Sequence, residues 1–93
     1  MYILTNEHHT TLYIGVTSDL KVRLREHLDK KYPKSFTAKY NLNKLIFVEH
    51  YATIDEAIQR EKQLKKKKRA NKDKLIDDQN PKWKDFSKEV LEW

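Results

Sequence analysis

The chain of 93 residues is predicted to fold as one small α/β (α+β) domain, in which helices flank a three-stranded antiparallel sheet. Three short runs of β-branched and aromatic residues predict the strands, because such side chains suit a pleated, half-buried surface. Two longer segments repeat apolar residues at helical spacing and predict the main helices. A second domain is excluded, because typical domains already have about 100–150 residues.

The first two predicted strands, residues 1–5 and 11–17, form an antiparallel hairpin joined by a polar loop. Alternation in the second strand places Tyr13 and Gly15 on one face. The third strand, residues 44–51, contains a continuous apolar run and is the strongest strand signal in the chain. The three segments therefore predict one small sheet.

Two helices are predicted between and after these strands. The first runs from about Asp19 to Lys30 and has a stripe of leucines spaced four residues apart, namely Leu20, Leu24 and Leu28. The second opens with the capping-box sequence 53–56 and runs to about Arg69. Its apolar stripe consists of Ile54, Ala57, Ile58 and Leu64.

Shorter elements complete the prediction. Residues 35–41 form a short helical turn, and Asn71 caps a short helix that carries Leu75 and Ile76. Residues 80–81 form a turn, and residues 87–93 form a C-terminal helical tail.

Composition excludes several classes of function. A single glycine excludes a Gly-rich phosphate loop and a dinucleotide fingerprint, and the absence of cysteine excludes thiolate metal sites and thiol nucleophiles. No apolar run reaches the ~18 residues of a membrane span, and no signal peptide precedes the first strand. The expectation is a basic, soluble, cytoplasmic domain without a membrane partner.

The positive charge is concentrated in one segment. Residues 60–74 hold nine basic side chains and two acidic ones, a net charge of +7, which leaves −1 for the rest of a chain whose total is +6. Such a segment favours a polyanionic partner, because neutralised phosphates release counterions. A solvated helix face or a localisation signal is the alternative.

Glu61 breaks the apolar pattern of the second helix, since it lies seven residues after Ile54 and three before Leu64. A carboxylate that faces a core is costly unless it is paired, hydrogen-bonded or bound to a cation. The two interpretations are a salt bridge to a buried arginine and a single metal ligand. The spacing alone does not decide between them.

Arg23 and His27 lie four residues apart, so they share a face of the first helix beside the leucine stripe. Surface helices often carry such pairs without a function. Arginine can also hold a phosphate with two hydrogen bonds, and histidine can orient or accept a proton at neutral pH.

These residues together resemble the GIY-YIG nuclease superfamily. Met1-Tyr2-Ile3-Leu4 and Leu12-Tyr13-Ile14-Gly15-Val16-Thr17 resemble its paired tyrosine signature, although the Gly-Ile that precedes the first family tyrosine is missing. Arg23 and His27 stand where the family has its helix arginine and a frequent histidine or tyrosine. Glu61 resembles the metal-binding glutamate. Asn80, which precedes Pro81, resembles the asparagine that closes the module, with Asn71 as its rival. The match is closest to small stand-alone bacterial members.

The resemblance implies a nuclease domain over residues 1–83, followed by a helical tail over 84–93. It also implies cleavage of a phosphodiester with one Mg²⁺ or Mn²⁺ ion, held by Glu61. Tyr2 would be the general base for water, Tyr13 would position water or phosphate, and Arg23 would hold the scissile phosphate. His27 would accept or orient the proton of Tyr2. We expect all five side chains to converge in one shallow groove.

Two further roles follow from the resemblance. Gly15 would let the strand backbone pass close to a neighbouring group, and Asn80 would orient the glutamate or close the local backbone.

The partner expected from this resemblance is nucleic acid, with DNA favoured over RNA. Its backbone would be contacted by Lys65, Lys68, Arg69 and Lys72. Two alternatives remain open: a nucleic-acid-binding module with little or no catalysis, and a protein-interaction domain.

Overall fold

The computed structural model describes residues 1–93, and three strands form its centre. They are β1 (Tyr2–Thr5), β2 (Leu12–Gly15) and β3 (Lys44–Val48). The sheet is antiparallel throughout, with the strand order β2-β1-β3. The predicted three-stranded antiparallel sheet is therefore confirmed, although two strands end earlier than predicted, at Gly15 and Val48.

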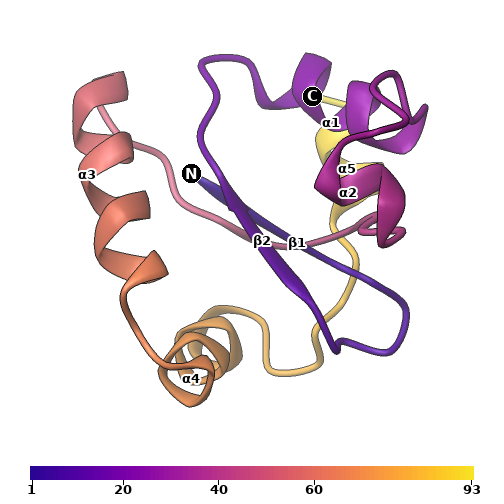
Figure 1. The fold of residues 1–93 in the computed structure, drawn as a ribbon. Helices are drawn as coiled ribbons and strands as arrows, with labels where there is room; N and C mark the ends of the chain where they lie inside the picture. Colours follow the sequence, from indigo (N-terminus) through magenta and orange to yellow (C-terminus); the bar gives the residue numbers. More distant parts are fainter.

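Five helices cover the sheet. They are α1 (Leu20–Leu28), α2 (Phe36–Lys39), α3 (Ile54–Lys65), α4 (Arg69–Gln79) and α5 (Ser87–Leu91). Figure 1 shows α3 and α4 on one side of the sheet and α1, α2 and α5 on the other. No helix of the chain is both long and apolar enough to span a bilayer.

Strand alternation separates two hydrophobic clusters, one on each face of the sheet. Ile3, Ile14 and Phe47 pack with side chains of α3 and α4, including the buried Leu64 and Ile76. The other cluster lies on the α1 side and consists of Tyr2, Leu4, Leu24, Leu42, Leu45 and Val90. Val90 belongs to α5, so the C-terminal tail packs on the domain.

The outer edge of β3 is closed by the end of α4 and the segment that follows it. The Gln79 amide bonds both backbone groups of Val48, at 3.1 and 2.9 Å. The Asn80 amide donates to the Ile46 carbonyl at 3.0 Å, and Asp85 accepts from the β3 backbone at 3.0 Å. β2 is the other terminal strand of the sheet, so no further strand pairs with its outer edge.

The predicted helix ending near Arg69 is wrong, because α3 ends at Lys65 and a separate α4 starts at Arg69. Tight backbone bonds from Lys66 and Lys67 to the carbonyls three residues earlier, at 3.3 and 3.0 Å, close α3. Asn71 lies inside α4 and is not its N-cap, which is Lys68. The chain bends between α3 and α4, and this bend lets both helices contribute apolar side chains to one cluster. No glycine or proline lies at the bend.

Candidate functional site

Tyr2 lies on the α1 face of the sheet with only 2% of its surface exposed. It pairs across the strands with Gly15, and its ring occupies the space that a side chain there would need. A Cβ added to Gly15 would stand 2.5 Å from both Cζ and Oη of Tyr2. The neighbouring group that Gly15 allows to approach is therefore the Tyr2 ring.

The backbone holds Tyr2 in place although it is the second residue. The Met1 amine donates to the Glu49 carbonyl at 2.9 Å, and the Glu49 N–H donates to the Met1 carbonyl at 2.8 Å. Met1 itself is buried in the cluster beneath α3. These contacts fix the start of β1 against the end of β3.

The Tyr2 hydroxyl bonds to Nε2 of His27 at 2.9 Å. The other ring nitrogen of His27, Nδ1, bonds to Oγ1 of Thr37 at 2.8 Å. Ser35, the N-cap of α2, has its Oγ 3.3 Å from Oγ1 of Thr37. A buried row of polar side chains therefore leads from β1 through α1 to α2.

Thr37, which is 4% exposed, is a member of this row that was not predicted from the sequence. In the sequence, Thr37 is only a hydroxyl residue near the start of a short predicted helix, and hydroxyl residues are common at helix starts. The contact with His27 joins two elements and cannot be read from local spacing.

Tyr13 and Arg23 complete this cluster. The Tyr13 ring lies 6.2 Å from the Tyr2 ring and 5.7 Å from the imidazole of His27. Arg23 interacts with the Tyr2 phenol, and its Nη1 lies 3.5 Å from Oε1 of Glu26. Half-buried Arg23 is thus held beside the phenol with part of its guanidinium open to solvent.

Burial shifts both central groups towards their neutral forms. It raises the pKa of Tyr2 well above the ordinary value of 10; Tyr13 adds to this effect and the positive charge of Arg23 opposes it. Burial also lowers the pKa of His27 to about 4, with Arg23 adding to the effect and Glu26 opposing it. At neutral pH the pair therefore consists of a phenol and a neutral imidazole.

This shift predicts that acid destabilises the fold through His27. The folded-state pKa of about 4 lies below the ordinary 6.5, so the unfolded chain binds more protons between these values. His27 does not reduce the free energy of unfolding above pH 6.5. As the pH falls towards 4, the free energy of unfolding decreases through this group by roughly 3 kcal/mol, at 1.36 kcal/mol per pKa unit. Urea unfolding across this range should show a weaker pH dependence for His27→Gln than for the wild type. Equal dependences in the two proteins would contradict the assignment.

Glu61 belongs to α3, which packs on the face of the sheet opposite to that of Tyr2. Its side chain is 21% exposed, and its Oε1 accepts from Nζ of Lys65 at 3.0 Å. No hydrogen bond or ion pair joins it to either tyrosine. It is near enough to the Met1 amine to raise the pKa of that group, whose net shift is downward because burial dominates. The structure therefore joins four of the five predicted site residues through contacts, and none of these contacts includes Glu61.

The residues around Glu61 fit a metal that takes most of its ligands from outside the protein. No group of three or more His, Asp or Glu side chains is arranged to hold an ion. Mg²⁺ commonly binds through one or two carboxylates and keeps several waters, with substrate phosphates completing its shell. The single half-buried carboxylate of Glu61 matches that donor set. The ammonium group of Lys65 would have to move away from this carboxylate before a cation could bind.

Asn80 lies at the edge of β3, away from β2. It is 4% exposed and holds the backbone of residues 46 and 84, with bonds of 3.0, 2.8 and 2.9 Å. Of the two roles expected for it, this geometry matches closure of the local backbone. Asn71 is exposed on α4.

The basic side chains expected to contact nucleic acid differ in their surroundings. Lys65 pairs with Glu61, whereas Lys68 is exposed at the start of α4. Lys72 is half-buried one turn into α4. Arg69 bonds to the carbonyls of His9 and Thr10, at 2.5 and 3.0 Å, and to Asp73 at 2.7 Å. Arg69 thus ties the β1–β2 loop to α4.

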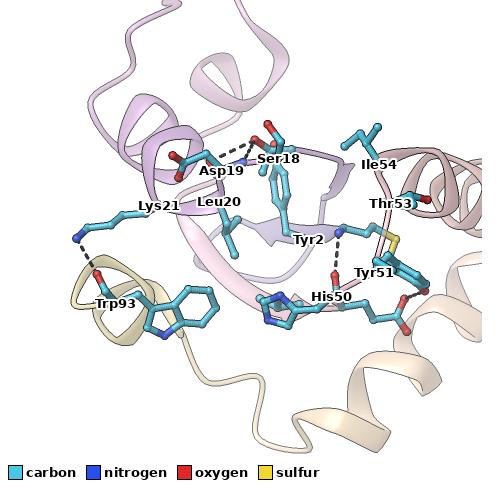
Figure 2. Close-up of a pocket in the computed structure, with 16 residues that line it drawn as sticks. Tyr2, Ser18, Asp19, Leu20, Lys21, His50, Tyr51, Thr53, Ile54 and Trp93 are labelled. Atoms are coloured by element: carbon cyan, nitrogen blue, oxygen red, sulfur yellow. Dashed lines mark hydrogen bonds between the residues drawn. The ribbon is translucent and has the colours of Figure 1, made fainter.

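A cleft of about 520 Å³ opens where the loops before α1 and α3 approach the end of β3 (Figure 2). Of the predicted catalytic residues, only Tyr2 lines it. Tyr13, Arg23, His27 and Glu61 do not line the cleft.

Comparisons with known proteins identify the family of the chain. Residues 1–74 match the family described as the GIY-YIG catalytic domain, a segment that includes the tyrosine cluster and Glu61 but not Asn80. A UPF0213 protein of Syntrophus aciditrophicus (strain SB) is 39% identical over 71 residues, which are 76% of this chain and 80% of the relative.

Two further UPF0213 proteins are similar. That of Bacillus licheniformis is 34% identical over 76 residues, covering 82% of this chain and 77% of the relative. That of Streptococcus pneumoniae serotype 4 is 38% identical over 64 residues, covering 69% and 64%. No solved structure matches the chain. With its tyrosine hairpin, its helix Arg and His, and a family match over most of its length, the chain belongs to the GIY-YIG nuclease-domain family.

Proposed function

We propose that this protein is a metal-dependent endonuclease that hydrolyses phosphodiester bonds in nucleic acid, DNA ahead of RNA. The observation that carries the proposal is the 2.9 Å hydrogen bond between the Tyr2 hydroxyl and His27, with Arg23 beside it, in a chain of this family. In these roles Tyr2 would be the base, His27 its proton acceptor and Arg23 the cation for the phosphate.

Tyr2 would act as the general base. A free phenolate is disfavoured at neutral pH because burial raises the pKa of Tyr2, and an imidazolium is disfavoured because burial lowers that of His27. Proton transfer from water to Tyr2 and from Tyr2 to Nε2 of His27 must therefore be coupled to the attack on phosphorus.

Arg23 and Tyr13 would bind the reacting phosphate. The guanidinium is partly open to solvent and Glu26 restrains it, so it can hold a non-bridging oxygen as negative charge develops there. Tyr13 is half-buried on the terminal strand and would position the attacking water or the phosphate beside Tyr2.

Glu61 would hold one Mg²⁺ or Mn²⁺ ion. A bound divalent ion neutralises phosphate oxygens and stabilises the leaving alkoxide. The substrate would lie along the edge of β2, because α1 with Arg23 and α3 with Glu61 flank the sheet on its two sides (Figure 1).

The proposal is tested by incubating the purified protein with labelled single-stranded, double-stranded and branched DNA, and with RNA. Each substrate is combined with Mg²⁺, Mn²⁺ or EDTA. Cleavage that requires the metal and is stopped by EDTA is the expected result. Tight binding without cleavage under every condition would refute it.

A second candidate is a nucleic-acid-binding module without turnover. The observation in its favour is the burial of the Tyr2 side chain, of which only 2% is exposed. The same assay separates the two functions, because the binding module gives shifted complexes and no products.

The lysine segment is predicted to supply affinity without sequence preference. Lys65 and Lys68 are expected to contribute most, because the Lys65 ammonium lies 3.0 Å from Glu61 in the proposed site. Lys65→Gln combined with Lys68→Gln should flatten the dependence of log K on log salt by up to roughly 2, at ~0.9 per phosphate contact. Lys66→Gln combined with Lys67→Gln changes the charge equally and is the matched control. Equal slopes for the wild type and both double variants would mean that the segment is only a solvated face.

A further inference from the structure

The His27 imidazole lies between two hydroxyl groups, and each ring nitrogen has one of them as its hydrogen-bond partner. Nε2 faces the Tyr2 hydroxyl at 2.9 Å and Nδ1 faces Oγ1 of Thr37 at 2.8 Å. A neutral imidazole carries one N–H and one lone pair, so one hydroxyl must donate to the ring and the other must accept from it. Which tautomer is present decides whether the Tyr2 proton points at the imidazole.

The surroundings of Tyr2 decide the direction of its hydrogen bond. The phenol is buried, and its hydroxyl has two possible acceptors: His27 Nε2 at 2.9 Å and the hydroxyl of Tyr13. The nearby Arg23 guanidinium can only donate, so it can only face lone pairs of the phenol oxygen. If Nε2 carried the ring proton, the phenol O–H could donate only to the Tyr13 hydroxyl, which is a much weaker acceptor than an imidazole nitrogen. Donation of the Tyr2 O–H to a lone pair on Nε2 is therefore the stronger arrangement for this buried pair.

We propose that Thr37 is a positioning residue whose Oγ1 accepts the Nδ1–H of His27 and so keeps the Nε2 lone pair directed at Tyr2. The geometry assigns the proton to Nδ1, where Thr37 is the one hydrogen-bond partner. The catalytic consequence rests on the proposed function, because Tyr2 can pass its proton to His27 only in this tautomer.

The local structure of α2 suits this task. Thr37 lies in the first turn of a four-residue helix, and Ser35 caps that helix by accepting from the Ala38 N–H at 3.3 Å. The Thr37 hydroxyl proton can go to Oγ of Ser35 at 3.3 Å, which leaves lone pairs of Oγ1 free to accept from His27. Thr37, at 4% exposed, is shielded from water, so solvent does not compete for the Nδ1–H.

The test is the tautomer of His27, read from long-range ¹⁵N–¹H correlation spectra of the labelled full chain at neutral pH. His27→Gln identifies the His27 signals among those of His8, His9 and His50. The wild type should show a protonated Nδ1 and an unprotonated Nε2. Thr37→Ser, which keeps the hydroxyl, should give the same pattern. Thr37→Val, which keeps the shape and removes the acceptor, should shift the population towards the Nε2–H form.

Cleavage measurements form the second arm. Thr37→Val should lower kcat about tenfold or more, within the range that general acid–base catalysis contributes, and should change KM by less than about twofold. Thr37→Ser should restore most of kcat. The spectra decide the tautomer even if the wild type cleaves nothing, so failure of the proposed function is recognised separately.

Two results would overturn the inference. One is a wild-type spectrum with the proton on Nε2. The other is a folded Thr37→Val protein that keeps the Nδ1–H form. If the valine variant does not fold, Thr37→Ala replaces it, and the wild-type spectrum still decides the position of the proton.

Discussion

Replacing Glu61 with Gln is expected to lower metal-dependent cleavage at least about 10³-fold, while nucleic-acid binding stays within about twofold. The amide keeps the shape of the side chain but loses the charge that would hold the cation, and several kcal/mol of transition-state stabilisation correspond to this factor. Cleavage rates measured against Mg²⁺ and Mn²⁺ concentration, together with binding in EDTA, check the result.

The matched control is Glu56→Gln on the same helix, an exposed carboxylate of its first turn. It should leave cleavage unchanged. The Glu61→Gln protein should be as stable as the wild type, because the loss of the pair with Lys65 is offset by removal of a half-buried charge. Full activity of Glu61→Gln would remove the main support for a metal site on α3.

Replacing Tyr2 with Phe is expected to lower kcat by about 10²–10⁴-fold, the range that a positioned general base contributes. The phenyl ring still packs over Gly15, so the sheet should form normally. The Nε2 atom of His27 loses its buried donor, which should lower stability by about 1–3 kcal/mol. Single-turnover cleavage and urea unfolding measure the two effects separately.

Tyr40→Phe is the control for this experiment, because Tyr40 is an exposed tyrosine of the same domain. It should change neither quantity. If Tyr2→Phe cleaves nearly as fast as the wild type, the Tyr2–His27 pair is part of the scaffold and another group must activate water.

Much of the fold could be predicted because its signals are local. Strand alternation placed Tyr13 and Gly15 on one face, and the structure puts both of them beside Tyr2. The cap predicted at Thr53 occurs as a bond from the backbone N–H three residues later, at 3.3 Å, and the helix predicted to start near Asp19 is capped by that residue at 3.2 Å. Such features need only neighbouring residues, so sequence reasoning reaches them.

The parts that were missed depend on contacts between distant elements. The break after Lys65 follows from how α3 and α4 reach a common core, and no breaker residue announces it. Thr37 gains its importance only because α2 folds back against α1. The apolar stripe marked Glu61 as unusual and the family resemblance suggested a metal ligand, but which face of the sheet α3 covers depends on contacts between distant residues.

The close fit of the Tyr2 ring over Gly15 has a consequence for how such sequences diverge. Positions 2 and 15 come from the two halves of the hairpin, yet they fill a single space. A chain that acquires a side chain at position 15 must first give up the aromatic ring at position 2, or the ring must leave its place against the imidazole. Related domains should therefore change these two positions together, in the order ring first and glycine second. The two tyrosine motifs look separate in the sequence, but the residues at positions 2 and 15 share one space, so each motif limits which residues the other can hold.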